Sequence, residues 1–96
     1  MKMNHVSSTS RPQRQECILK QAADGTTVLL DLEGGQYYSL DAVGARVWDL
    51  CDGRRTVSEM AVILGAEYDA AVAAIERDAL ELLQDLANEN LVVETP

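Results

Sequence analysis

The chain is poor in the residues that usually perform covalent or acid–base chemistry. Its 96 residues include one His and two Cys, and neither Cys17 nor Cys51 belongs to a CxxC pair. The sequence contains no HExxH, GxSxG, P-loop or GxGxxG motif. A domain of this length is also too small to enclose a deep catalytic cleft. We therefore expect a protein that is not an enzyme and that works through a surface or a shallow groove.

Long apolar runs and metal-binding patterns are scarce as well. No segment approaches the roughly 18 consecutive apolar residues typical of a membrane span, and no apolar core follows the N-terminal charges as in a signal peptide. The lone His5 and the two cysteines do not form the four-ligand set of structural zinc. The sequence thus predicts a cytoplasmic protein without membrane association, metal or cofactor. Both cysteines are expected to be reduced thiols, with Cys51 in the core.

Basic residues are rare beyond the N-terminus. From residue 16 to residue 96 the chain has five Lys or Arg against sixteen Asp or Glu. Such an acidic surface repels phosphate backbones and favours cationic or neutral partners. Acidity that only improves solubility would explain the composition equally well.

Residues 1–15 differ from the rest because they are polar and have almost nothing to bury. They predict a disordered N-terminal tail ahead of one domain over residues 16–96. Apolar and β-branched residues then predict three short strands, of which the last two are joined by a Gly-rich hairpin turn at 33–35. These strands are expected at residues 17–19, 26–32 and 36–40.

Helical patterns follow the strands. Three helices are predicted over residues 42–52, 56–64 and 70–89, with N-caps at Asp41, Thr56 and Asp69. Thr56 and Glu59 match a capping box, while Gly53 and Gly65 are predicted to end the first two helices. A final apolar run at 91–93 is expected to pack back like a strand. The order predicts an α+β fold of the winged helix-turn-helix type, a three-stranded antiparallel sheet followed by three helices.

Winged helices often bind DNA, so a DNA-binding regulator is one alternative. The last predicted helix opposes it, because DNA affinity comes mainly from Lys and Arg contacts to phosphates. That helix has Arg77 as its one base against five acids, namely Glu76, Asp78, Glu81, Asp85 and Glu89. We expect no nucleic-acid partner.

The third strand offers a different kind of surface. Residues 36–40 are uncharged and short, and an edge strand can pair with an extended peptide through its free backbone groups. Period-two alternation puts Tyr38 and Leu40 on one face and Tyr37 on the other. Whichever tyrosine points inward covers the core, and the outward one stays available to a ligand. Leu80, which lies off the apolar stripe of the last helix, either widens a groove or is an ordinary exposed Leu.

Four short motifs, taken in order, resemble the PqqD-like family of precursor-peptide recognition elements. They are Leu29-Leu30-Asp31-Leu32, Gly35-Gln36-Tyr37-Tyr38-Ser39-Leu40-Asp41, Gly44-Ala45-Arg46-Val47-Trp48 and Cys51-Asp52-Gly53-Arg54-Arg55-Thr56-Val57-Ser58-Glu59. The resemblance covers about residues 16–94. It implies a domain that binds the leader segment of a ribosomally made precursor peptide as an added strand and delivers it to a separate modifying enzyme.

The resemblance also implies a site between the third strand and the third helix. The strand positions, matched by motif, are Gln36, Tyr37, Tyr38, Ser39 and Leu40. The helix positions, inferred only from the face they occupy, are Val72, Ile75, Glu76 and Ala79.

The motif texture is more similar to the stand-alone leader-binding proteins of lasso-peptide assembly, which work beside a leader peptidase and a cyclase. Members that serve pyrroloquinoline quinone assembly tend to carry Pro-Glu in the second strand. This chain instead has Asp-Leu-Glu-Gly-Gly at residues 31–35. A peptide chaperone of that pathway, acting with a radical SAM enzyme, is the alternative. The same exposed edge would also allow a homodimer.

Overall fold

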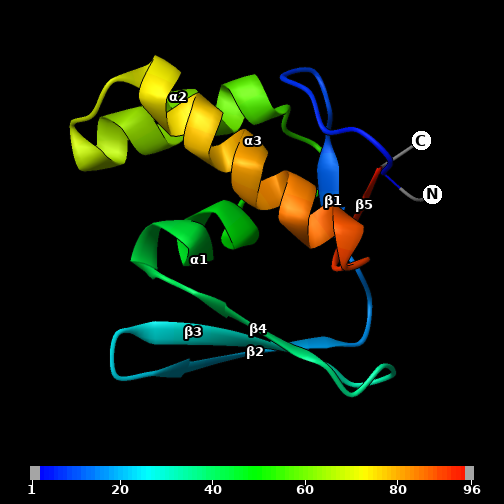
Figure 1. Cartoon of the computed structure of the whole chain (residues 1–96). Helices are drawn as coiled ribbons and strands as arrows, with labels where there is room; N and C mark the ends of the chain where they lie inside the picture. The colour runs from blue at the N-terminus through cyan, green and yellow to red at the C-terminus, as the bar shows by residue number, and fades with distance from the viewer. Residues whose placement is uncertain (1–2, 95–96) are drawn as a thin grey trace.

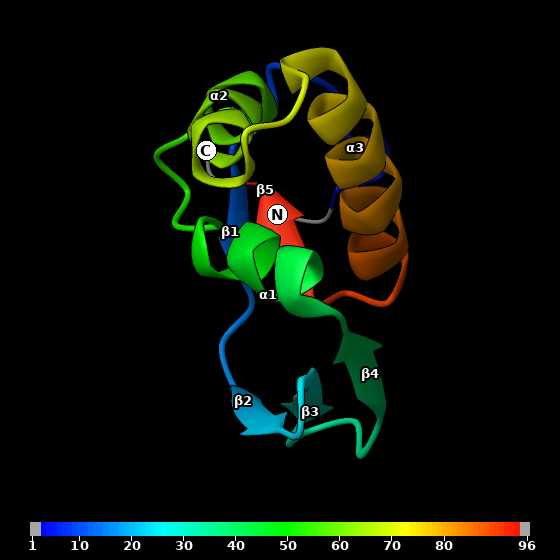
Figure 2. The same cartoon turned by 90° about the vertical axis from the view of Figure 1, so that its left-hand side faces the viewer.

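Two small sheets and three helices form the fold of residues 3–94 (Figure 1). The computed structural model describes residues 3–94, except for the side chain of Ala23. The strands are β1 (Pro12–Arg14), β2 (Ile18–Ala23), β3 (Thr26–Asp31), β4 (Tyr37–Leu40) and β5 (Val92–Glu94), and the helices are α1 (Ala42–Asp49), α2 (Val57–Tyr68) and α3 (Val72–Asn88). Figure 2 shows α1 between the β2-β3-β4 sheet and the layer that holds α2 and α3. The predicted three strands followed by three helices are confirmed.

The three-stranded sheet is antiparallel in the order β2-β3-β4. The register pairs Leu29 of β3 with Tyr38 of β4. The turn between these strands is closed by Asp31, whose Oδ1 accepts hydrogen bonds of 3.0 Å from the N–H groups of Glu33 and Gly34. Gly35 completes it with a φ of +72°, a conformation that costs glycine little. The predicted hairpin is therefore confirmed.

Capping chemistry fixes where the helices begin. Asp41 Oδ1 accepts a hydrogen bond of 2.7 Å from Gly44 N–H at the start of α1. At α2 the predicted capping box is present, since Thr56 Oγ1 accepts from Glu59 N–H and Glu59 Oε1 accepts from Thr56 N–H. The hydrogen bond from Thr56 N–H holds the pKa of Glu59 below its usual value. Local sequence was sufficient for both helix starts.

Three predicted helix boundaries were wrong. α1 ends at Asp49 with Leu50 as its C-cap, three residues before the predicted end at residue 52. Gly65 does not end α2, which continues to Tyr68. Gly65 is buried instead. A Cβ there would lie 3.0 Å from Val72 Cγ2, so the lack of a side chain lets α2 approach the start of α3 closely. Asp69 does not cap α3 but ends α2 in the left-handed conformation, and Ala71 precedes α3 without a side-chain cap.

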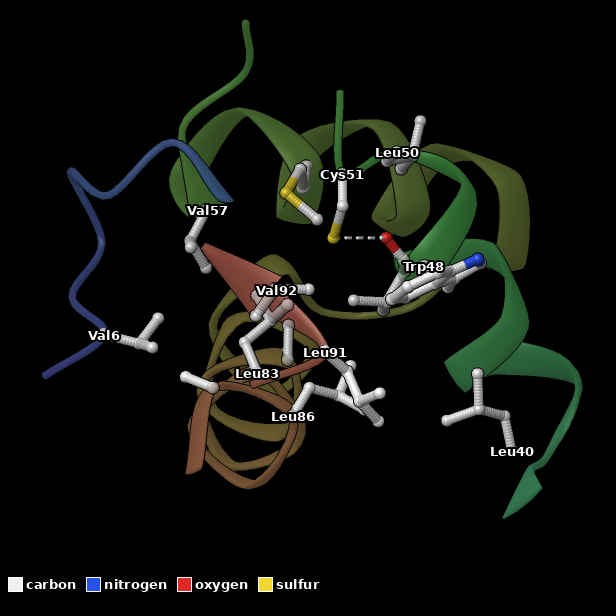
Figure 3. Packing of buried hydrophobic residues seen from close by; sticks show 14 of the residues in the cluster. Val6, Leu40, Trp48, Leu50, Cys51, Val57, Leu83, Leu86, Leu91 and Val92 are labelled. Carbon is white, nitrogen blue, oxygen red and sulfur yellow. Dashed lines mark hydrogen bonds between the residues drawn. The ribbon is translucent and has the colours of Figure 1, made fainter. Parts of the chain in front are cut away.

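The core lies where the helices meet β4, β5 and the N-terminal segment (Figure 3). Trp48 is only 3% exposed and Leu83 is fully buried. The predicted core position of Cys51 is confirmed, and its thiol donates a hydrogen bond of 3.2 Å to Val47 O. Burial raises the pKa of this thiol to about 12, so the group stays protonated at neutral pH.

The N-terminal residues correct the prediction of a disordered tail over residues 1–15. Residues 1–2 lie outside the described part, but Met3, Val6 and Pro12 are buried, and β1 pairs with β5. Val6 N–H also donates to Gln84 Oε1 on α3. The polar composition of this segment does not indicate that Met3, Val6 and Pro12 are buried, because they pack against residues far away in the sequence. The predicted strand-like return at 91–93 is confirmed as part of this pairing.

Replacing Thr56 with alanine should lower the free energy of unfolding by about 1 kcal/mol, because Glu59 N–H loses its cap. Urea denaturation followed through Trp48, the single Trp of the chain, would measure the change. Val62→Ala is a suitable control, since Val62 lies on the same helix and is 59% exposed. Equal stabilities of the two variants would contradict the capping assignment.

Candidate functional site

The edge of β4 offers unpaired backbone groups. β4 pairs with β3 on one side and is the last strand of its sheet. Asp31 N–H donates to Gln36 O at 2.8 Å, and hydrogen-bonded and non-hydrogen-bonded pairs alternate in an antiparallel ladder. Tyr38 and Leu40 therefore direct their N–H and C=O groups toward β3. The N–H and C=O groups of Tyr37 and Ser39 point out of the sheet edge.

A groove of about 460 Å³ runs beside this edge. Its walls are β4 and α3, and α1 forms its floor. The lining residues are Tyr38, Ser39, Leu40, Asp41, Val43, Gly44, Val47, Ile75, Asp78, Ala79 and Leu82. Five predicted site residues are thus brought together, which are Tyr38, Ser39, Leu40, Ile75 and Ala79.

A second hollow of about 460 Å³ follows toward the β3–β4 turn. It is lined by Gly35, Gln36, Tyr37, Tyr38, Glu89 and Leu91. Tyr38 borders both hollows, so together they form one continuous surface, called here the docking groove. The groove contains the remaining predicted strand residues, Gln36 and Tyr37. Since Leu40 faces Ile75 at one end and Tyr37 lies near Glu89 at the other, β4 and α3 run in opposite directions.

The two tyrosines have different surroundings. Tyr37 is 74% exposed, whereas Tyr38 is half-buried and packs against the core. Partial burial, and then the charges of Asp85 and Glu89, raise the pKa of Tyr38. Tyr38 is therefore the inward tyrosine, and it covers the core while also lining the docking groove.

Two predicted helix residues face away from the groove. The Glu76 carboxylate accepts a hydrogen bond of 3.1 Å from Ser58 Oγ of α2, and Val72 packs beside Gly65 of the same helix. Both lie on the flank of α3 that α2 covers. Leu80 is also outside the groove, in a third hollow next to His5 and Val6. The sequence predicted the apolar stripe of α3, but not which flank would meet β4.

The structure adds groove residues that the sequence reasoning missed. Asp78 and Leu82 of α3 follow Ile75 at offsets of three and seven, a helical spacing that could have identified them. On the floor, Gly44 lies so close to β4 that a Cβ there would be 3.3 Å from Leu40 Cδ2.

Among residues 3–94, no three His, Cys, Asp or Glu side chains are grouped as a metal site would require. None of the described helices is long and apolar enough to span a bilayer.

Comparison with known families and proteins gives consistent matches. Residues 26–92 match the family described as coenzyme PQQ synthesis protein D (PqqD). The chain is 37% identical over 89 residues to the PqqA binding protein of Rhodopseudomonas palustris strain TIE-1, which covers 93% of this chain and 87% of that protein. It is also 46% identical over 55 residues to the bifunctional coenzyme PQQ synthesis protein C/D of Methylorubrum extorquens. That alignment covers 57% of this chain and 15% of the longer protein.

Two solved structures share the fold. The solution structure of the PqqD truncation of Methylobacterium extorquens PqqCD, a stand-alone RiPP recognition element, has a TM-score of 0.80 at 34% identity and covers 93% of this chain and 95% of its own. TbiB1 in complex with the TbiA(beta) leader peptide has a TM-score of 0.72 at 34% identity, covering 83% and 93%.

Proposed function

Because this chain belongs to the PqqD family, we propose that it is a recognition element for ribosomally synthesised precursor peptides. The leader segment pairs with β4 as an added strand, and its inward side chains enter the docking groove. The observation that carries this proposal is that the backbone N–H and C=O groups of Tyr37 and Ser39 point out of the sheet edge. They do so beside a groove lined by β4, α1 and α3. The similarity to TbiB1, which was solved with a leader peptide, supports leader binding by this fold.

The proposed pathway is of the lasso-peptide type, in which the bound leader is presented to a leader peptidase and a cyclase. The similarity to lasso peptide synthetase B1 in complex with the leader peptide supports it, with a TM-score of 0.69 at 28% identity. The alternative is a peptide chaperone of pyrroloquinoline quinone assembly beside a radical SAM enzyme, favoured by the similarity to PqqA binding proteins. Titration with the TbiA(beta) leader and with PqqA side by side would separate the two, together with any short precursor encoded next to this gene.

We further propose that the chain is a cytoplasmic binding protein without catalysis, metal or cofactor, and that the modifying chemistry belongs to its partner. The open β4 edge would also allow two copies to pair as a homodimer in the absence of leader. For the fold we propose the winged helix-turn-helix class, supported by the short connection through Asp69 and Ala71 between α2 and α3.

Replacing Tyr38 with alanine should weaken leader binding by about 5- to 30-fold, because the ring borders both parts of the docking groove and aromatic side chains supply large contact areas. Fluorescence anisotropy of a labelled leader would measure the affinity, and the circular dichroism spectrum would check the fold. Tyr38→Phe keeps the ring and should bind within about twofold of the wild type. Unchanged affinity of the alanine variant would exclude this groove as the peptide site.

A further inference from the structure

One stripe of α3, continued by the C-cap residue Glu89, runs beside the docking groove. Residues 75, 78, 82, 85 and 89 follow one another at steps of three and four, which places them on the same side of a helix. Ile75, Asp78 and Leu82 line the first hollow, and Glu89 lines the second. Asp85 lines neither of them but borders the third hollow beside His5, and its charge is near enough to Tyr38 to act on the phenol at the boundary of the two groove hollows. The stripe is therefore mainly apolar at one end and acidic at the other.

The carboxylates at the acidic end have no basic partner among the described residues. Lys20 and Arg46 pair with Asp49, and Arg46 also pairs with Glu67. Arg55 pairs with Asp52. None of the ion pairs formed within residues 3–94 includes Asp85 or Glu89.

Two other carboxylates line the first hollow, and each has a partner within the chain. Asp41 accepts the capping hydrogen bond at α1, and Asp78 lies 3.6 Å from the Arg77 guanidinium. Burial and the charges of Asp85 and Glu89 together raise the pKa of Tyr38, which is consistent with a local negative field at this end of the groove. Asp85 and Glu89 differ from these two, since no ion pair or hydrogen bond of their carboxylates is formed within the described residues.

The spacing of the two ends can be expressed in residues of a bound strand. The midpoint of Asp85 and Glu89 lies roughly 13 Å along α3 from the midpoint of Ile75 and Leu82, at about 1.5 Å per residue. An extended peptide covers that distance in about four residues at roughly 3.3 Å each. Positions four apart in a strand have side chains on the same face. A peptide antiparallel to β4, the commoner pairing, would meet the apolar end first.

We infer that the docking groove selects leaders with a large apolar residue followed, four positions later, by Lys or Arg, which meets Asp85 and Glu89. This inference rests on the proposed function and names the class of peptide that the site accepts. The apolar residue lies against Leu40, Ile75 and Leu82, as the lining of the first hollow indicates. The charge complementarity follows from acids that have no partner within the described chain.

The inference can be tested with a phage-displayed library of random 14-residue peptides. The library is selected in parallel for binding to the wild-type protein and for binding to the Asp85→Asn/Glu89→Gln variant. Wild-type selection should enrich Lys and Arg at least about threefold four positions after an apolar residue, and the double variant should lose that enrichment. Titration of one selected peptide should show about 3- to 10-fold weaker binding to the variant at low salt, as expected for exposed ion pairs. Screening should remove most of the difference at about 0.5 M salt.

The matched control is Asp69→Asn/Glu81→Gln, which removes the same charge from exposed positions outside the docking groove. Asn tolerates the left-handed conformation of residue 69, and the control should bind within about twofold of the wild type. Selected peptides that bind the Asp85/Glu89 variant as tightly as the wild type would overturn the inference but leave the proposed function intact, provided that Ser39→Pro weakens their binding by at least about 10-fold. If no selected peptide responds to Ser39→Pro, the proposed function itself fails.

Discussion

Replacing Ser39 with proline is expected to weaken leader-peptide binding by about 10- to 100-fold while leaving the fold intact. The N–H of Ser39 points out of the β4 edge, as the alternation from the Asp31–Gln36 hydrogen bond shows, so proline removes a donor that the sheet itself does not use. A peptide carbonyl left without its partner costs about 1–3 kcal/mol, and the ring obstructs the approach of a strand. Isothermal titration calorimetry with a leader peptide that binds the wild-type protein would measure the loss of affinity.

Two variants at neighbouring positions make this test specific. Ser39→Ala keeps the N–H and should bind within about twofold of the wild type. Tyr38→Pro removes an N–H that points toward β3 and should lower stability as well. If Ser39→Pro binds leader as tightly as Ser39→Ala and both are folded, strand addition at β4 is excluded, even if another surface holds the peptide.

The parts of this fold that the sequence predicted correctly are those governed by neighbouring residues. The capping box at Thr56 and Glu59 involves two side chains three positions apart, and each satisfies the backbone of the other. The turn after Asp31 combines local side-chain hydrogen bonds with a glycine at positive φ. Alternation along β4 likewise separated Tyr38 from Tyr37. The sequence therefore predicted one half of the docking groove, the wall formed by β4.

The other wall depended on contacts between distant segments. The amphipathic pattern of α3 places Val72, Ile75 and Ala79 near one stripe, but α2 covers one flank and leaves the other to β4. That choice follows from the close approach at Gly65, which a pattern of single residues does not specify. Glu76 illustrates the consequence, because it bonds Ser58 of α2 and does not face the groove.

Deleting residues 1–15 should lower the free energy of unfolding by at least about 3 kcal/mol. Burial of Met3 and Val6 is worth about 1.5–3 kcal/mol for each side chain, and β5 would lose the strand with which it pairs. The deletion also removes three backbone acceptors for the body of the domain: Ser8 O for Ser58 N–H, Ser10 O for Val57 N–H and Pro12 O for Gly53 N–H. Urea denaturation of the 16–96 fragment, followed through Trp48, would measure the effect.

The size of this loss matters because a domain of this kind has only about 5–15 kcal/mol of stability in total. Val6→Ala in the full chain should cause a smaller loss, about 1–3 kcal/mol, whereas His5→Gln should stay within about 0.5 kcal/mol, since His5 is exposed. That gradation would assign the effect to buried contacts and not to chain length. A 16–96 fragment with the urea midpoint of the full chain would mean that β1 and its buried neighbours contribute nothing to folding. The segment would then be the mobile tail that its composition suggests.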